Sequence, residues 1–358
     1  MQKRSERIDK LSDAIDRWLQ PDNSELKEAI DLTVSEKLFS LEDIKHRILS
    51  LKNTLTRENL IRWAELSKLN PESNQGKEIV CLHAGNLPMV GIQDLLATIL
   101  TGAKYVGKLS KKDPYLLPTL ISKLKISDVA DNPQWTVNIG QLRGIKAKAI
   151  LFAGSGKSVQ KVKSKLRSIG VANSNTPALI RTAHFSIAWI RDMEPETMVD
   201  LTEAVFRYGG RGCRSAAIVV APEPLLSNSC SFTDYIESFW IKNPQFEKPE
   251  ESLKHRFALN RAVGVPQLWL DHFLIEERFE QPDENFILYW IKGGESELKE
   301  LIQKTQNGLQ SVFTTGSYMD RQIEGFTLEP LSEAQNPPIW WRPDGVEPIS
   351  WLQEHSND

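Results

Sequence analysis

Apolar residues in the first 70 positions recur at the three- and four-residue spacing of an amphipathic helix. The first such series consists of Ile8, Leu11, Ile15, Trp18 and Leu19. A second series runs from 41 to 51, and Pro21 and the pair Asn70-Pro71 interrupt the pattern. The N-terminal segment is therefore predicted to be helical.

From residue 77 the pattern changes to short apolar runs that alternate with glycine-containing turns and amphipathic stretches. The runs at 77–83 and 103–110 are predicted to be strands on either side of a helix over 89–102. A further strand at 146–153 leads through the turn GSGKS into a helix over 159–170. This alternation predicts βαβ units and a largely parallel sheet wound with helices.

The same alternation continues in the second half of the chain. Strands are predicted at 186–190 and 216–222 with a helix between them, and a strand at 285–291 is followed by another helix. Residues 223–260 mix prolines, serines and aromatics, and we expect a less regular helical region there. The predicted fold class is α/β, with a doubly wound domain and a second α/β domain.

The length of 358 residues favours two domains over one, because single cores rarely grow that large. We expect a first domain over 1–183, which includes the helical N-terminal segment, and a second over 184–330. The tryptophan- and proline-rich end, 331–358, is expected to pack across the seam between them.

Composition narrows the possible functions. A net charge of −3 with 25% charged residues disfavours a general nucleic-acid binder, and no apolar run is long enough for stable membrane insertion. Three unpaired cysteines and six scattered histidines predict neither a disulfide framework nor a metal site. A cytoplasmic protein is the simplest expectation.

Cys213 is the candidate nucleophile because of its neighbours. It lies in the run RYGGRGCRS, where three glycines and two arginines would leave the sulfur on an exposed turn between cations. Nearby cations lower a thiol pKa and increase the reactive thiolate fraction. The alternative is that Cys213 is a small buried apolar residue. Cys81 and Cys230 lack this setting and are interpreted as structural.

Two glycine-containing turns could supply the rest of a site. GSGKS matches the end of a phosphate-binding P-loop, but Leu151 stands where that loop has its first glycine. The turn therefore either holds one phosphate or is only a tight turn. In the turn HAGNLP, the Asn86 amide could stabilise an oxyanion at the carboxyl end of the sheet. Alternatively, Asn86 caps a helix that Pro88 begins.

Taken in order, these motifs resemble those of the aldehyde dehydrogenase superfamily. GNLP is similar to its WNFP turn, KLS at 108–110 to its KPS, AGS at 153–155 to its TGS, and Cys213 to its nucleophile. The closest resemblance is to acyl-CoA reductases typified by the fatty-acid reductase of bacterial bioluminescence. That family shares a G-x-G-C-R run, KLS followed by Asp-Pro, and a DGV ending, here in PDGVEPISWL. The resemblance covers about 80–358.

The resemblance implies an aldehyde dehydrogenase-like fold, with an NADP-binding first domain and a catalytic second domain. It implies that Cys213 attacks an acyl thioester while Asn86 holds the oxyanion, and that NADPH reduces the thioacyl enzyme to an aldehyde. The implied cofactor-binding residues are Lys108, Ser110, Lys111, Gly154 and Ser155. Lys111 replaces the glutamate that follows KPS in NAD-preferring relatives, which favours the 2′-phosphate of NADPH unless Lys111 and Lys112 are only a solvated pair.

The sequence also departs from the family pattern. The glutamate of the ELGGK stretch, the base in hydrolytic members, finds no counterpart in RTAHFSIAWI at 181–190, which favours aldehyde release over acid formation. His184 is a candidate proton donor there, or else a packed histidine.

We therefore expect an NADPH-dependent acyl-CoA or acyl-carrier thioester reductase. Candidate partners are acyl-CoA, an acyl-carrier protein, an acyl-activating enzyme and a second copy of the chain. The alternatives are an aldehyde dehydrogenase acting in the oxidising direction, a small-molecule kinase or NTPase built on GSGKS, and a non-catalytic scaffold subunit.

Overall fold

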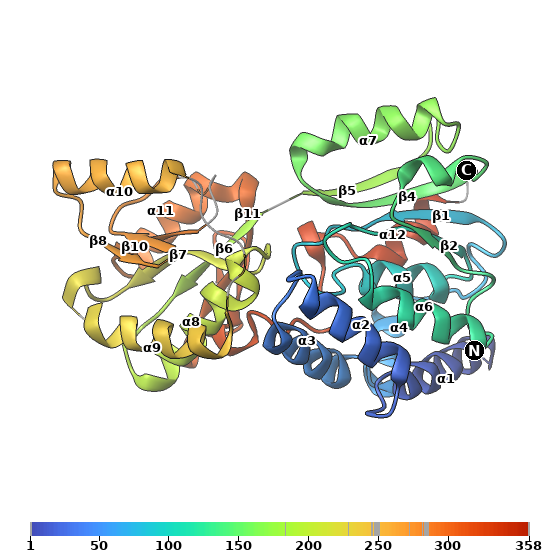
Figure 1. Ribbon diagram of the computed structural model, residues 1–358, viewed down its shortest axis with the longest axis horizontal. Coiled ribbons are helices and arrows are strands. Elements are labelled where there is room, and N and C mark those ends of the chain that lie inside the picture. The colour runs from blue at the N-terminus through green and yellow to red at the C-terminus, as the bar shows by residue number, and fades with distance from the viewer. Residues whose placement is uncertain are drawn as a thin grey trace. The chain divides into compact units, whose positions relative to one another are not determined.

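The computed structural model divides the chain into two compact units. The first comprises Met1–Ala183 and Pro338–Asp358, and the second His184–Pro337 (Figure 1). Residues described by the structure are 2–182, 184–227, 229–244, 246, 251–271, 273–280, 282 and 286–356. None of the helices in these ranges is both long and apolar enough to cross a membrane.

The N-terminal segment is helical, as its apolar spacing predicts. Its helices are α1 (Gln2–Trp18), α2 (Ser24–Ser35), α3 (Leu41–Thr54) and α4 (Arg57–Leu66). Each of the last three begins after a residue whose side-chain oxygen accepts a backbone N–H three positions on: Asn23, Ser40 and Thr56. The apolar series of α1 is buried in the core of the first unit.

A five-stranded parallel sheet forms the centre of the first unit, in the order β3-β2-β1-β4-β5. Its strands are β1 (Glu78–Leu82), β2 (Lys104–Lys108), β3 (Gln134–Thr136), β4 (Ala147–Gly154) and β5 (Ala178–Thr182). One face packs against the N-terminal helices and against α5 (Ile92–Leu100), α6 (Leu116–Ile126) and α12 (Pro348–His355). The other face packs against α7 (Gly156–Ser168) (Figure 1). Helices on both faces make this a doubly wound sheet.

The C-terminal segment returns to the first unit. The Trp63 indole donates to the carboxylate of Glu347 (2.8 Å), and the Gln93 amide donates to the carbonyls of Ile339 and Trp341 (2.7 Å each). Within the expected segment 331–358, the part 331–337 is grouped with the second unit. Packing across a seam stays a prediction.

An eight-stranded sheet forms the second unit, in the order β12-β13-β11-β6-β7-β10-β9-β8. Its strands are β6 (Phe185–Trp189), β7 (Ala216–Ala221), β8 (Gln267–Leu270), β9 (Phe273–Glu276), β10 (Ile287–Lys292), β11 (Leu309–Thr314), β12 (Gln322–Ile323) and β13 (Phe326–Pro330). The edge pairs β8·β9 and β12·β13 are antiparallel, and the other pairs are parallel. The pattern at 223–260 did not indicate the short strands β8 and β9 that follow it.

Helices cover both faces of this sheet as well. The helices α8 (Pro195–Phe206) and α9 (Ser229–Lys242) pack on one face, and α10 (Glu251–Val263) and α11 (Glu295–Thr305) pack on the other (Figure 1). The predicted α/β fold class is confirmed in both units.

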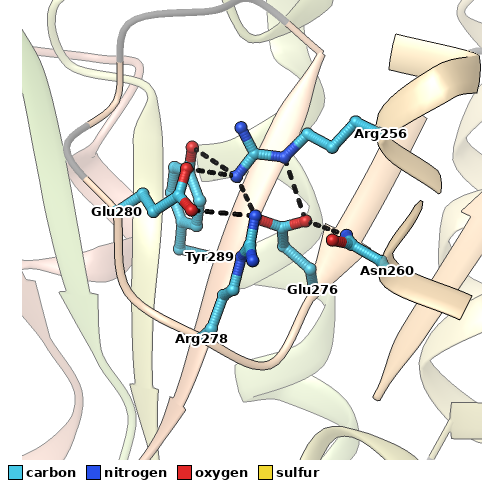
Figure 2. A network of polar contacts seen from close by, with 6 residues as sticks. All are labelled: Arg256, Asn260, Glu276, Arg278, Glu280 and Tyr289. Carbon is cyan, nitrogen blue, oxygen red and sulfur yellow. Dashed lines mark hydrogen bonds and ion pairs between the residues drawn. The ribbon is translucent and has the colours of Figure 1, made fainter. Parts of the chain in front are cut away.

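An ionic network joins α10 to β9 (Figure 2). The Glu276 carboxylate is fully buried and accepts hydrogen bonds from Arg256, Asn260 and Arg278. Although burial opposes ionisation, the bonds from Arg256 and Asn260 hold the pKa of Glu276 below its ordinary value. Glu280 bridges the outer sides of both arginines (2.7 and 2.8 Å). Because the buried charge is fully partnered, we interpret this network as structural.

Candidate functional site

Strand register brings three of the predicted motifs to one edge of the first sheet. Leu82, the last residue of β1, pairs with Lys108 of β2 on one side and with Phe152 of β4 on the other. The strands are parallel, so the turns that follow them lie side by side at their carboxyl ends. Ligands of open α/β sheets bind at this edge.

The turn that carries Asn86 is not a helix cap. Residues 83–91 are irregular, and α5 begins at Ile92 after Gly91 as its N-cap residue. Asn86 is half-buried. The interpretation of Asn86 as the cap of a helix begun by Pro88 is therefore wrong, and so is the expected helix start at 89. The oxyanion role stays a prediction.

Close packing joins this turn to the KLS turn after β2. The backbone N–H of His83 donates to the carbonyl of Lys108 (2.9 Å). A Cβ added at Gly85 would overlap the side chain of Ser110. Only glycine fits at position 85, which explains why the turn HAGNLP has a glycine before Asn86.

Asp113 links the same two turns through a hydrogen bond. Its carboxylate accepts the backbone N–H of Met89 (2.6 Å), and Met89 is buried with a left-handed backbone (φ 55°). Burial raises the pKa of Asp113 to about 7, although the Met89 bond and the charge of Arg47 on α3 oppose this shift. Asp113 is therefore a titratable contact between the two turns.

Lys108 and Lys111 form the basic end of β2. Lys108 is half-buried, and burial, followed by repulsion from Lys111, lowers its pKa. Lys111 and Lys112 are exposed. Because Lys108 and Lys111 are close enough to repel each other, an anion bound there would relieve an existing unfavourable interaction.

The Gly154-Ser155 turn joins β4 to α7. Ser155 is exposed and occupies the N-cap position, but its hydroxyl bonds the hydroxyl of Ser158 (3.2 Å) instead of a backbone N–H of the helix. The amino end of α7 therefore lacks a side-chain cap, and its backbone donors can bind an anion. At Gly154, a Cβ would approach the Phe152 ring to 2.8 Å.

Buried polar side chains lie beneath this edge, and the sequence pattern did not predict them. The His83 imidazole bonds the Tyr105 hydroxyl (2.7 Å), and burial lowers the pKa of His83 to about 4, so the ring is neutral at pH 7. Asp94 on α5 pairs with Arg181 on β5 (2.5 Å), and both side chains are buried. Nothing in the apolar run around Asp94 signals this pair.

Cys81 also lies in the first unit. It is buried and within 3.5 Å of the Thr98 hydroxyl, and burial raises its thiol pKa. A protonated, inaccessible thiol cannot act as a nucleophile. Cys230 has no described side chain, so its structural role stays a prediction.

Cys213 lies on a turn just before β7 in the second unit, and it is half-buried. The turn is reached through three residues with left-handed backbone, Tyr208, Gly209 and Gly210 (φ 57°, 70° and 69°). The Ser186 hydroxyl donates to the Cys213 carbonyl (2.9 Å) and fixes the turn to β6. The glycines therefore shape the approach to the cysteine, as the sequence suggested.

The two arginines beside Cys213 have different environments. Arg214 is buried, pairs with Glu329 (2.7 Å) and donates to the carbonyl of Ala334 (2.7 Å). Arg211 donates to the carbonyl of Tyr208 (3.0 Å). Glu329 balances the charge of Arg214, whereas Arg211 is bonded to a backbone carbonyl. The effect of these two cations on the sulfur stays a prediction.

His184 directly precedes β6 and is half-buried. It belongs, like Cys213, to the second unit, whereas Asn86 and the predicted cofactor residues belong to the first. Its role as a proton donor stays a prediction. Among the described residues, no cluster of His, Cys, Asp and Glu side chains could hold a metal ion.

The fold resembles those of solved aldehyde dehydrogenases. An aldehyde dehydrogenase of Physcomitrella patens with the product succinate has a TM-score of 0.64 and 13% identity, over 99% of this chain and 84% of that one. A succinic semialdehyde dehydrogenase of Streptococcus pyogenes with NADP+ has a TM-score of 0.59 and 12% identity, over 88% and 78%. An oxidoreductase of Marinobacter aquaeolei has a TM-score of 0.62 and 13% identity, over 88% and 73%.

No protein-family model and no curated protein sequence matches the chain. The structural likeness establishes an aldehyde dehydrogenase-like fold, as the resemblance implied. At 12 to 13% identity this likeness shows the fold alone, so the activity is argued from the residues of the site.

Replacing Asp113 with Asn should change how stability depends on pH. Folded Asp113 titrates near pH 7 and unfolded aspartate near 4, so ionisation destabilises the fold as pH rises through this window. Between pH 5 and 8, the wild type should lose roughly 2 to 3 kcal/mol of unfolding free energy relative to Asp113→Asn. Urea unfolding at several pH values measures this difference.

The matched control is Asp131→Asn, which removes an exposed carboxylate from the same unit. Its unfolding free energy should follow that of the wild type at every pH. Parallel curves for the wild type and Asp113→Asn would show that Asp113 is ionised throughout.

Proposed function

We propose that this protein reduces an acyl thioester to an aldehyde with NADPH, through a thioacyl intermediate on Cys213. The observation that carries this proposal is the half-buried cysteine on a glycine-shaped turn before β7, in an aldehyde dehydrogenase-like fold. The predicted cofactor residues support it, because they share one edge of the first sheet.

The reaction has two chemical steps. The Cys213 thiolate attacks the thioester carbonyl, so that a carbon–sulfur bond forms to Cys213 and the donor thiolate leaves. A hydride, which is two electrons and one proton, is then added to the carbonyl carbon, the bond to Cys213 breaks, and the aldehyde leaves. The net change consumes one acyl thioester, one NADPH and one proton, and produces an aldehyde, a thiol and NADP+.

The strand-end edge of the first unit fits a phosphorylated dinucleotide. The uncapped amino end of α7, at Ser155, offers backbone donors to a pyrophosphate. Lys108 would hold the adenosine ribose, and Ser110 lies beside it in the same turn. Bound NADPH supplies the hydride; the residues of this chain bind and orient it.

Asn86 and His184 complete the proposed chemistry. The Asn86 amide would donate to the oxygen that gains negative charge in both steps, an effect whose loss costs on the order of 3 kcal/mol elsewhere. His184 would give a proton to the departing group. Cys81 takes no part, because its thiol is buried.

The end of β5 favours reduction over hydrolysis. Residues 178–182 and 184–189 include no carboxylate, and the charged side chain among them, Arg181, is buried and paired with Asp94. No carboxylate of this segment could activate water against the thioacyl enzyme. The intermediate therefore persists long enough to be reduced.

The acyl donor would be acyl-CoA or an acyl-carrier protein, supplied in the cell by an acyl-activating enzyme. The chain would act in the cytoplasm, alone or as a homo-oligomer. The rival functions are oxidation of an aldehyde in the reverse direction and a non-catalytic scaffold role.

The purified protein should consume NADPH when given acyl-CoAs and release a trappable aldehyde in equal amount. Cys213→Ala should lower turnover by at least about a thousandfold, because it removes the nucleophile. Nicotinamide absorbance and a hydrazine trap measure both products. The control Cys81→Ala should keep its turnover per folded molecule.

Three outcomes would contradict the proposal. NADP+ reduction by aldehydes without CoA would indicate the oxidising function. An active Cys213→Ala variant would disprove the thioacyl mechanism. A folded wild type that turns over none of these substrates would favour the scaffold role.

Lys111→Glu should reverse a preference for NADPH over NADH. The substitution restores a carboxylate that repels the 2′-phosphate, so the Michaelis constant for NADPH should rise about tenfold or more while that for NADH changes little. Added salt should reduce the difference. Lys52→Glu, at an exposed position on α3, is the control for net charge. Equal effects on both cofactors would place Lys111 among the solvated lysines.

A further inference from the structure

The charge of the chain is distributed unevenly. The stretch 132–191 contains ten lysines and arginines and no aspartate or glutamate, although the whole chain has a net charge of −3. Eight of these cations belong to α7, to the start of β4 and to the segment that enters β4. We call them the α7 surface: Arg143, Lys146, Lys148, Lys157, Lys161, Lys163, Lys165 and Arg167.

These cations face solvent because the apolar side of α7 is already used. Val159, Val162 and Leu166 pack on the sheet. All members of the α7 surface are exposed except Lys163, which is half-buried. Lys157, Lys161 and Lys165 are spaced by four residues, so they form one row about 12 Å long on the helix.

The segment before β4 continues this row past the end of the helix. The Lys146 ammonium donates to the carbonyl of Gly170, directly after α7 (3.1 Å). Beside it, burial and then repulsion from Lys148 lower the pKa of Lys77. Like charges are therefore crowded at this end of the sheet as well.

The positive charge is uncompensated. In the part of the chain that the structure describes, none of the eight cations forms an ion pair. The carboxylate of Glu78 lies at this end of the sheet and accepts the backbone N–H of Lys146 (2.9 Å), not its ammonium. Such a surface attracts a polyanion and accelerates its association.

An acidic protein fits this surface better than a nucleic acid or a membrane. Single-stranded nucleic acids bind to aromatic side chains, and α7 has none. Insertion at a membrane surface needs an exposed apolar helix face, and that of α7 is packed. Carboxylates four residues apart on a partner helix would match the lysine row.

We propose that the α7 surface docks an acidic protein that carries the acyl group as a thioester. This inference rests on the proposed function and selects a protein-bound donor over free acyl-CoA. The surface begins at Lys157, two residues from Ser155, and runs away from the cofactor edge to Lys146. A partner aligned along it would therefore have one end beside that edge.

The test compares one acyl chain on two donors, purified acyl-carrier protein and CoA. The double variant Lys161→Glu/Lys165→Glu should lower kcat/KM for the carrier-bound chain about tenfold or more through KM, because attraction becomes repulsion. It should leave kcat/KM for acyl-CoA within about twofold. The same tenfold loss should appear in the Kd for unloaded carrier protein, and wild-type binding should weaken with salt.

The control variant is Lys27→Glu/Lys52→Glu, which makes the same charge change at exposed positions of α2 and α3. Its constants for both donors should match the wild type. Equal losses in both double variants, or equal losses for both donors, would overturn the docking site.

Direct binding separates this inference from the proposed function. A wild type that binds the carrier protein at α7 but turns over neither donor would disprove the reductase and keep the docking surface. A wild type that does not bind the carrier at low salt, or that binds only an oligonucleotide or anionic vesicles through these lysines, would disprove the docking proposal.

Discussion

In-register parallel pairing of β2, β1 and β4 is the constraint on which the candidate site depends. Leu82 is paired with both Lys108 and Phe152, so the three following turns emerge at one edge. Motifs separated by up to about 70 residues in the sequence are thereby brought together. Gly85 against Ser110, and Asp113 bonded to Met89, then set how closely two of these turns pack. A one-residue slip of β1 would exchange the side chains on its two buried faces and shift its turn by about 3.3 Å against the other two.

The sequence predicted those features that depend on local pattern. Apolar periodicity located the N-terminal helices and most long strands, and the glycines around Cys213 indicated a special turn, which the left-handed Gly209 and Gly210 provide. It could not reveal partners distant in the chain. Asp94 lies within an apolar helix and acquires its role only because Arg181 approaches from β5, and Arg214 is neutralised by Glu329, which is remote in sequence. Asn86 does not cap a helix because Pro88, which is typical of a helix start, precedes the actual start at Ile92 by four residues.

Burial divides the titratable groups of the first unit into two sets. Beneath the strand-end edge, His83 is neutral, Cys81 keeps its proton, and Asp94 is paired with Arg181. This layer stabilises the turns but offers no reactive group. The more accessible set, which includes Lys108, Lys111 and the lysines of α7, is strongly positive. The two sets suit different tasks. The buried groups hold the turns in place, and the basic surface attracts anionic cofactors and partners.

Acylation of Cys213 is the step on which the proposed reaction depends, and mass spectrometry detects it directly. The protein is mixed with an acyl-CoA or with an acylated carrier protein in the absence of NADPH, and its intact mass and proteolytic peptides are measured. We expect one acyl group per chain, located on the peptide that contains Cys213 and removed when NADPH is added. A protein that neither donor modifies, or an acyl group on Cys81 or Cys230, would disprove the thioacyl mechanism.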